Sequence, residues 1–312
     1  MPKISFALPV FNEESGIASF HEELTKALSV RSDLDVELVY VNDGSADESL
    51  ARLLDLQRQD PRVRIVDLSR NFGHQMAITA GIEHCTGEAV IVMDTDLQDP
   101  PAVALQLVDA WQGGADVVYA QRRKRDDRPF KRFTAFAYYR SFKYLAGIEI
   151  PHDTGDFRLM SRQVVDVFLR YRERNRFIRG LVPSLGFRQE SVLFDRSGRF
   201  AGESKYPLSK MLKLAADGIT SLSTIPLRFI TRLGLVSVLV AFVGIVYALV
   251  LRLFFPDVAL PGFTLTLVAI LFMGGVQMLS LGVIGSYVGR IYAEVQSRPL
   301  YIVRRVIENE SG

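Results

Sequence analysis

Two long uncharged apolar runs near the C-terminal end constrain the fold of this 312-residue chain more than any other feature. No residue is charged from Leu233 to Leu251, and none is charged from Val258 to Val288. A helix needs about 20 apolar residues to cross a hydrocarbon layer of ~30 Å, so each run is long enough to span a membrane. About ten residues, from Arg252 to Gly262, join the runs. We therefore expect an antiparallel transmembrane hairpin at about 233–252 and 263–286, the alternative being two buried helices of a soluble core.

Positive charge flanks the open end of this hairpin and is sparse in the segment that joins the two runs. By the positive-inside rule, we expect a multi-pass protein of the inner (cytoplasmic) membrane, with both termini and the N-terminal domain in the cytoplasm. The single cysteine, Cys85, fits a reducing compartment. The net charge of +2 argues against a nucleic-acid binder, while the basic residues gathered between Arg188 and Arg232 favour anionic lipid or phosphate. The flanking arginines are Arg228, Arg232, Arg290, Arg298, Arg304 and Arg305.

The first 120 residues alternate between strand-like and helix-like segments. Such alternation predicts an α/β fold with a parallel, doubly wound sheet, in which ligands bind beyond the carboxyl ends of the strands. The strand-like segments are short and rich in Val and Ile, and the others have helical spacing. We predict strands at 4–10, 36–43, 64–69, 88–94 and 115–121, and helices at 14–29, 47–59, 74–84 and 102–112.

The rest of the chain divides into four parts. We assign 1–206 to the cytoplasmic α/β domain, 207–230 to interfacial amphipathic helices, 231–290 to the hairpin and 291–312 to a cytoplasmic tail. In the second part, apolar residues recur at helical spacing with Lys210 and Lys213 among them, as in a helix that lies in the membrane interface. Within the first part, we predict a helix at 131–146, and a loop at 153–160 that leads into a helix capped by Ser161.

The stretch "MDTDLQDPP" places three carboxylates and a glutamine directly after a predicted strand. If strand alternation continues, Asp94, Asp96 and Gln98 point to the same side and can converge on one cation. Hard oxygen ligands of this kind suit Mg²⁺ or Mn²⁺, which also bind diphosphates. The alternative to a metal site is that these carboxylates only solvate a turn or cap the next helix. We expect such a role, in place of metal binding, for Asp99.

Two other predicted strands also end on polar residues. Asn12 and Glu13 follow the first strand, and Asp43 ends the second. Such side chains can read a base edge or a ribose hydroxyl. A turn followed by a helix cap would explain the rest of "NDGSAD" but leaves Asp43 without a role. The polar groups therefore predict one crevice at the carboxyl edge of the sheet.

Six motifs, in this order and spread over almost the whole chain, resemble a known family. They are "LPVFNEE", "VNDGSAD", "LSRNFGHQMAITAGI", "MDTDLQDPP", "DTGDFRLMSR" and "GESKYPLSKML". They are similar to the polyprenyl-phosphate glycosyltransferases, inverting GT-A enzymes of family 2 that include dolichol-phosphate mannose synthase and bactoprenol glucosyl transferase. The hairpin is more similar to the bactoprenol glucosyl transferases than to single-domain mannose synthases.

The resemblance implies transfer of a hexose from a nucleotide sugar to a lipid phosphate at the cytoplasmic face, with Mg²⁺ or Mn²⁺ as cofactor. We expect UDP-glucose and undecaprenyl phosphate as substrates, with GDP-mannose as the alternative donor. A non-catalytic membrane scaffold or lipid carrier is the alternative of another class. Small residues in "GGVQMLSLGVIGSYVG" permit close helix packing within the hairpin or between subunits, and we expect a homo-oligomer.

The resemblance also implies roles for individual residues. Asp96 and Asp156 are the expected catalytic residues, with Asp156 orienting the acceptor or the hexose and Asp153 able to replace it. His74 is expected only to begin a helix. For the donor we expect Pro9, Phe11, Asn12, Glu13, Asp43, Asn71, Gly73 and Asp94, and for the metal Asp94, Asp96 and Gln98. For the acceptor phosphate we expect Arg122, Arg199 and Lys205, whose alternative role is contact with anionic headgroups.

Two other classes of enzyme fit less well. Processive polysaccharide synthases share the GT-A core but resemble one another in a Gln-x-x-Arg-Trp motif and in several more membrane helices. Here the only tryptophan, Trp111, lies in "DAWQG". Phosphohydrolases with a nucleophilic Asp-x-Asp carry that pair after the first strand, whereas the pair in this chain follows the fourth predicted strand.

Overall fold

The computed structural model describes residues 1–123, 154–174, 176–195, 225–254 and 262–308. The chain separates into two units, one formed by Met1–Tyr206 with Arg298–Gly312 and the other by Pro207–Ser297, and each is described by itself. Several predictions concern residues outside the described part. These are the helix at 131–146, most of the interfacial segment 207–230, and the side chains of Asp153, Arg199 and Lys205.

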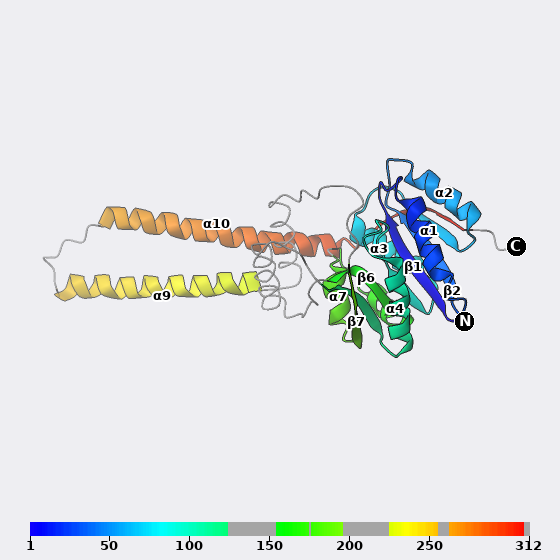
Figure 1. Ribbon diagram of the computed structural model, residues 1–312. Helices are drawn as coiled ribbons and strands as arrows, with labels where there is room; N and C mark the ends of the chain where they lie inside the picture. The colour runs from blue at the N-terminus through cyan, green and yellow to red at the C-terminus, as the bar shows by residue number, and fades with distance from the viewer. Residues whose placement is uncertain (124–153, 175, 196–224, 255–261, 309–312) are drawn as a thin grey trace. The chain divides into compact units, whose positions relative to one another are not determined.

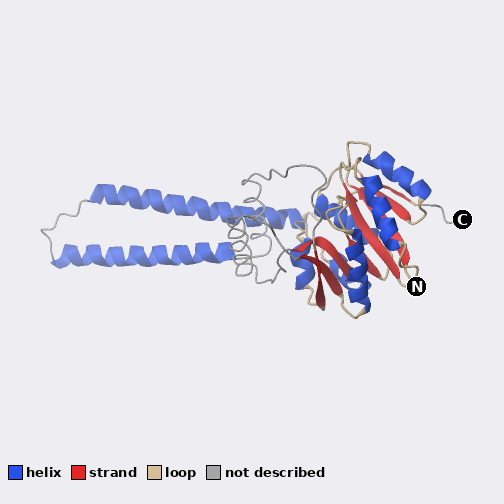
Figure 2. Cartoon of the chain, in the orientation of Figure 1, coloured by secondary structure: helices blue, strands red, loops and turns tan. Residues whose placement is uncertain are grey.

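An eight-stranded mixed sheet lies at the centre of the first unit, with the order β7-β5-β6-β4-β1-β2-β3-β8. Figure 2 draws its strands in red and the helices that pack on them in blue. The pairs β1–β2, β1–β4 and β2–β3 are parallel, as the strand–helix alternation predicts, and the pair β5–β7 is parallel as well. The pairs β4–β6, β5–β6 and β3–β8 are antiparallel, so the sheet is mixed. Each of these pairs contains β6 or β8, and both strands lie beyond the first 120 residues from which the parallel strands were predicted. The strands are β1 (Lys3–Val10), β2 (Asp35–Asn42), β3 (Val63–Leu68), β4 (Ala89–Val92), β5 (Val117–Arg122), β6 (Thr154–Ser161), β7 (Gln189–Phe194) and β8 (Val303–Ile307).

Helices cover both faces of this sheet, which confirms the doubly wound α/β prediction (Figure 1). Strand residues alternate between two apolar cores: Phe6 and Leu8 of β1 belong to one core, and Ala7 belongs to the other. The first core receives α1 (Ile17–Leu28), α2 (Ser49–Gln59) and α4 (Pro101–Gln112). The second receives α3 (His74–His84), α6 (Arg162–Arg170) and α7 (Ile178–Ser184).

The predicted loop at 153–160 is instead the central antiparallel strand β6. Phe157 and Leu159 point into the first core, while the opposite face carries Asp156 and Arg158, which are both buried. Two charged residues in eight are typical of a loop, and they interrupt the continuous apolar run expected of a strand that is buried on both faces. Ser161 does precede α6 as predicted, but its hydroxyl makes no capping hydrogen bond.

The segment predicted as a C-terminal tail contains β8, which pairs with the edge strand β3. Two adjacent arginines in a five-residue strand gave no apolar alternation to detect. Charged residues of this kind are common on edge strands, where they discourage pairing with other chains.

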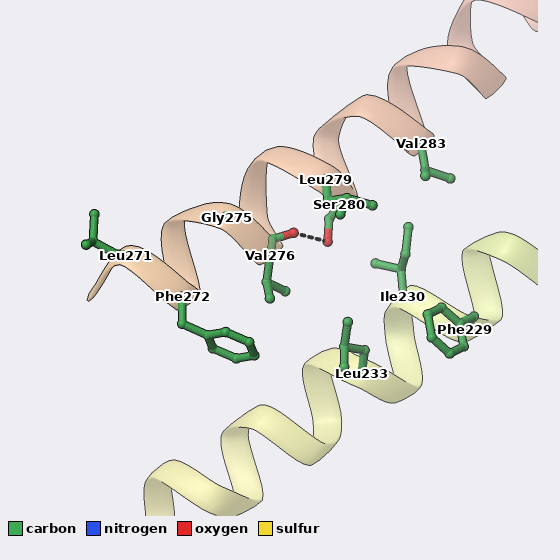
Figure 3. Close-up of a pocket in the computed structure, with 10 residues that line it drawn as sticks. All are labelled: Phe229, Ile230, Leu233, Leu271, Phe272, Gly275, Val276, Leu279, Ser280 and Val283. Atoms are coloured by element: carbon green, nitrogen blue, oxygen red, sulfur yellow. Dashed lines mark hydrogen bonds between the residues drawn. The ribbon is translucent and has the colours of Figure 1, made fainter. Parts of the chain in front are cut away.

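The second unit contains two long helices, α9 (Ile225–Phe254) and α10 (Gly262–Val295), which run antiparallel (Figure 1). By length and composition, Leu227–Leu251 and Ala269–Val295 could each cross a membrane. An apolar groove lies between the two helices (Figure 3). Its one hydroxyl among the labelled residues, on Ser280, donates to Val276 O at 2.7 Å, so this polar group is satisfied within its own helix (Figure 3).

Candidate active site

A pocket of about 390 Å³ opens at the carboxyl ends of the parallel strands. The residues that follow β1, β2, β3 and β4 meet there because these strands are parallel. Eight of the lining residues are ones that the sequence predicts to contact donor or metal. The lining consists of Pro9, Val10, Phe11, Glu13, Asp43, Asn71, Gly73, His74, Ala77, Asp94, Thr95 and Asp96.

The acidic stretch after β4 is bent rather than extended. β4 ends at Val92, and Leu97 has a left-handed φ of 57°. The expectation that strand alternation aligns the three metal ligands is therefore wrong, because these residues no longer belong to a strand. Asp94 and Asp96 nevertheless line the pocket, while Gln98 is buried and lies outside its lining. The bend is closed by Gln98 N–H, which donates to Asp96 Oδ1 at 3.0 Å.

Negative charge accumulates at this end of the pocket. Burial raises the pKa of Glu13, and the carboxylates of Asp96, Asp47 and Asp94 raise it further. Burial also raises the pKa of Asp94, although His74 opposes this shift. Asp94 Oδ1 is buried and accepts no hydrogen bond from the described residues. A cation would relieve both the mutual repulsion and the unsatisfied oxygen.

The carboxylates of the pocket suit a metal ion that takes only some of its ligands from the protein. In the described ranges, no three His, Cys, Asp or Glu side chains are grouped to hold a metal by themselves. Mg²⁺ is commonly bound through one or two carboxylates together with the phosphates of a substrate. Asp94 and Asp96 supply such a pair of carboxylates at the pocket wall.

Asp43 holds the opposite wall of the pocket. Its Oδ1 accepts from Phe72 N–H at 2.7 Å and its Oδ2 from Gly73 N–H at 3.0 Å, and the side chain is buried. Burial raises the pKa of Asp43, whereas the two N–H donors lower it and so stabilise the carboxylate. Asp43 thus has a structural role that the sequence did not reveal. Its contact with a nucleoside stays a prediction.

Asn12 joins the loops after β1 and β2. Its φ is 54°, its Oδ1 accepts from Ala46 N–H at 2.9 Å, and its own N–H donates to Ser45 Oγ at 3.1 Å. Asn12 does not line the pocket itself, although Phe11 and Glu13 on either side of it do. Its predicted donor contact stays a prediction beside this bridging role.

Asp156 is buried on β6 and held by three side chains. Arg179 donates to it as a fork, Nε to Oδ1 at 3.0 Å and Nη2 to Oδ2 at 2.9 Å. Gln75 Nε2 donates to Oδ2 at 3.2 Å. His74 Nε2 lies 3.6 Å from Asp156 Oδ2 and 3.4 Å from Asp94 Oδ1, so the imidazole bridges the two predicted site carboxylates.

The charges in this network act on one another. Burial alone would raise the pKa of Asp156, but the interactions with His74 and Arg179 outweigh it and hold that pKa well below its usual range. Burial alone would lower the pKa of His74, but the carboxylates of Asp156 and Asp94 outweigh this effect and raise the pKa of His74. Asp156 is therefore a stable carboxylate and a poor acceptor of protons.

Three residues of this network were not predicted from the sequence. His74 does begin α3 as predicted, but it also lines the pocket, and its place after a strand end was a signal for that role. Gln75 carries the same signal, and its Oε1 accepts from Ile178 N–H at 3.1 Å. Arg179 carried none, because it reaches Asp156 only through the packing of α7 against β6.

The structure describes one of the three predicted acceptor residues. Arg122 ends β5, and its Nη2 lies 3.8 Å from the position that a Cβ on Gly155 would occupy. Its guanidinium is therefore close to the residue before Asp156. Arg199 and Lys205 fall outside the described ranges.

Comparison with known proteins gives consistent matches. Residues 5–169 match the family model described as glycosyl transferase family 2. The chain is 46% identical over 309 residues to the uncharacterized glycosyltransferase YkcC of Bacillus subtilis (strain 168), covering 98% of this chain and 95% of that protein. It is 41% identical over 304 residues to the bactoprenol glucosyl transferase of Shigella phage SfII, covering 97% and 98%.

Among solved structures, glucosyl-3-phosphoglycerate synthase from Mycobacterium tuberculosis aligns with a TM-score of 0.46 and 20% identity, over 71% of this chain and 77% of that one. The residues that match the family model include every residue that lines the pocket. The chain therefore belongs to glycosyl transferase family 2 and is a glycosyltransferase.

Proposed function

We propose that this enzyme transfers a hexose, most directly glucose from UDP-glucose, to a polyprenyl phosphate such as undecaprenyl phosphate. The transfer inverts the anomeric carbon and takes place at the cytoplasmic face of the membrane. One observation carries this proposal: the acidic pocket of a family 2 glycosyltransferase occurs in a chain with two helices that could cross a membrane. A lipid acceptor resides in the membrane, so we expect an enzyme that uses it to be anchored there. The likeness to a bactoprenol glucosyl transferase over 97% of this chain, hairpin included, supports the same acceptor class.

The donor would bind with its diphosphate toward the acidic end of the pocket. Asp94 and Asp96 would hold Mg²⁺ or Mn²⁺ there, with Gln98 proposed as a further ligand. When bound, the metal would neutralise charge that develops on the diphosphate as it leaves. The nucleoside would lie toward Asp43 and Asn71, against the wall that Asp43 holds. Phe11, which is half-exposed at the pocket, offers an aromatic face to the base.

The acceptor would need positioning rather than activation. A lipid phosphate is anionic at neutral pH, so one of its oxygens can attack the anomeric carbon without a general base. The bond from that carbon to the diphosphate oxygen breaks, and its electron pair leaves with the nucleoside diphosphate. The low pKa of Asp156 supports a role in orienting acceptor or hexose instead of taking a proton. Arg122, Arg199 and Lys205 are the proposed contacts of the lipid phosphate.

A donor panel tests this function. The purified full chain is incubated with Mg²⁺, undecaprenyl phosphate and labelled UDP- and GDP-sugars, and lipid-linked sugar is measured after extraction. We expect a lipid-linked monophosphate sugar, formed fastest from UDP-glucose. Product from GDP-mannose alone would select the mannose synthase alternative, and no product from any donor would refute the proposal in favour of a scaffold or carrier. Parallel reactions without lipid phosphate control for simple donor hydrolysis.

A further inference from the structure

The C-terminal strand β8 has no role in the chemistry proposed above. The chain reaches β8 only after both apolar helices, since α10 ends at Val295 and β8 begins at Val303. β8 then pairs with β3, and β3 leads directly into residues 69–73, which we call the donor loop. Asn71 and Gly73 of the donor loop line the pocket. The last strand of the chain is therefore in contact with the segment that forms a pocket wall.

Both backbone polar groups of Ser69, the first residue of the donor loop, are bound by the C-terminal segment. Ser69 N–H donates to Ile302 O at 2.9 Å, and Arg304 Nη2 donates to Ser69 O at 2.9 Å. The register of the β3–β8 pair shifts just before this point, between Asp67 and Leu68. The regular ladder ends there, and these two hydrogen bonds fix the start of the donor loop in its place.

The charge of β8 also has a buried partner at the end of β3. Asp67 is fully buried, and its Oδ1 accepts from Asn42 Nδ2 at 2.8 Å. Its Oδ2 accepts no hydrogen bond from the described residues but lies 3.4 Å from Arg305 Nε and 4.0 Å from Arg304 Nη1. A buried carboxylate needs a nearby cation, and β8 supplies it. Asn42 directly precedes Asp43, which lines the pocket. The contacts of Asp67 therefore connect β8 with the wall of the pocket that contains Asp43.

The donor loop is held from its other side by the end of β2. Asp43 accepts from Phe72 N–H and Gly73 N–H, and Gly44 packs against the backbone of Arg70 and Asn71. The loop therefore lies between two supports. One support belongs to the parallel core of the sheet, and the other is the strand that follows the membrane hairpin in the sequence.

We propose that β8 is a positioning element of the donor pocket and that Arg304 is its positioning residue, acting through Ser69 on the donor loop. The part of this inference that concerns donor affinity rests on the proposed function of the pocket. The part that concerns loop position does not. It follows that the chain after the hairpin is needed to shape the donor site, and that it does more than anchor the enzyme.

The test uses the full chain with three variants. R304M removes the donor to Ser69 O, R304K retains a cation with a donor, and R298A removes a positive charge from the same segment at an exposed residue. Because the Arg304 side chain is 59% exposed, R304M is expected to fold. If it does not, R304A, which also lacks a side-chain donor, is measured in its place, with the same two results required.

Hydrogen exchange without nucleotide is the first measurement. We expect exchange in peptides that cover the donor loop to be at least fivefold faster in R304M, close to wild type in R304K, and unchanged in R298A. Equal exchange in R304M and wild type would overturn the inference whatever the substrate of the enzyme is. This arm therefore separates failure of the inference from failure of the proposed function.

Steady-state kinetics is the second measurement. R304M should raise the donor KM roughly five- to tenfold, with kcat and the acceptor KM within twofold of wild type, as expected for loss of one charge-assisted hydrogen bond that supports the loop. R304K should recover most of the donor KM. A fall in kcat with an unchanged donor KM, or equal effects of R304M and R298A, would contradict a positioning role in donor binding.

Discussion

Replacing Gly44 by alanine should displace the donor loop, and Gly186 offers a matched control. Both glycines have a left-handed φ, +64° at Gly44 and +77° at Gly186. A Cβ on Gly186 would meet nothing within 4 Å, whereas a Cβ on Gly44 would lie 2.4 Å from Arg70 C and 2.5 Å from Asn71 N. G44A and G186A therefore share the backbone strain, and they differ in the collision with the loop.

The magnitude follows from these distances. A residue other than glycine costs about 1–2 kcal/mol in the left-handed region, and this applies to both variants. Ordinary contact begins near 3.4 Å, so in G44A the loop must retreat by about 1 Å. That movement stretches the two hydrogen bonds from Phe72 and Gly73 to Asp43, now at 2.7 and 3.0 Å. Hydrogen bonds to a charged group contribute about 1.5–3 kcal/mol each, so losing even one makes G44A less stable than G186A by roughly 2 kcal/mol or more.

Thermal unfolding of the full chain, followed by the fluorescence of Trp111, measures this difference. We expect Tm to fall by roughly 8 °C or more in G44A and by less than about 5 °C in G186A, relative to wild type. The donor KM should rise in G44A alone, because only this variant moves the pocket wall. Equal falls in Tm would refute the claim that loop packing requires Gly44. A lower Tm with an unchanged donor KM would refute the role of the donor loop in binding.

Three further predictions concern the carboxylates and a partly buried histidine, His21. D96N should reduce transfer at least about 100-fold and weaken the dependence on Mg²⁺, and a wild-type rate with wild-type metal dependence would exclude Asp96 as a ligand. R179M should lower kcat because Arg179 acts through Asp156. The kcat of the double variant R179M/D156N should therefore be only slightly lower than that of D156N. Additive losses of kcat would show that Arg179 and Asp156 act independently. Burial lowers the pKa of His21 below 6.5 despite the charge of Asp60. As the pH falls, the unfolded chain therefore binds a proton at His21 before the folded chain does. The stability that neutral His21 contributes is complete above about pH 6.5 and is lost as the pH falls through the folded pKa. H21Q should show less of this decline in Tm between pH 7.5 and 5, and an unchanged profile would contradict the assignment.

Local patterns predicted much of the fold. The helix at His74–His84 has the predicted bounds, and three other helices differ by at most three residues at either end. Apolar spacing suffices for such elements because one face of each helix is buried against the sheet. β6 escaped detection because Asp156 and Arg158 interrupt the continuous apolar run expected of a strand that is buried on both faces, and Asp156 is stabilised by Arg179, which is 23 positions away. β8 escaped because its pairing with β3 joins residues more than 200 positions apart.

The candidate site shows the same division. Strand ends predicted four residues that line one pocket, because the carboxyl ends of parallel strands meet at one edge of a sheet, and the family resemblance added four more. The first four are Glu13, Asp43, Asp94 and Asp96, and the others are Pro9, Phe11, Asn71 and Gly73. The strand ends did not predict how the acidic stretch bends at Leu97, which removes Gln98 from the lining. They also did not predict that His74 lies between Asp94 and Asp156, since that contact needs β6 beside β4 in antiparallel orientation.

By itself, the sequence determined the α/β class, the two apolar helices, the set of polar residues at the strand ends and, through its motifs, the family. These properties depend on residues that are near one another in the chain, and their periodicity can be read directly. The tertiary structure alone decided that Asp156 is an ionised carboxylate held by Arg179, that Asp43 supports the donor loop, and that β8 completes the sheet beside it. These properties depend on charges and hydrogen bonds between distant segments, and such contacts leave no periodic signal in the sequence.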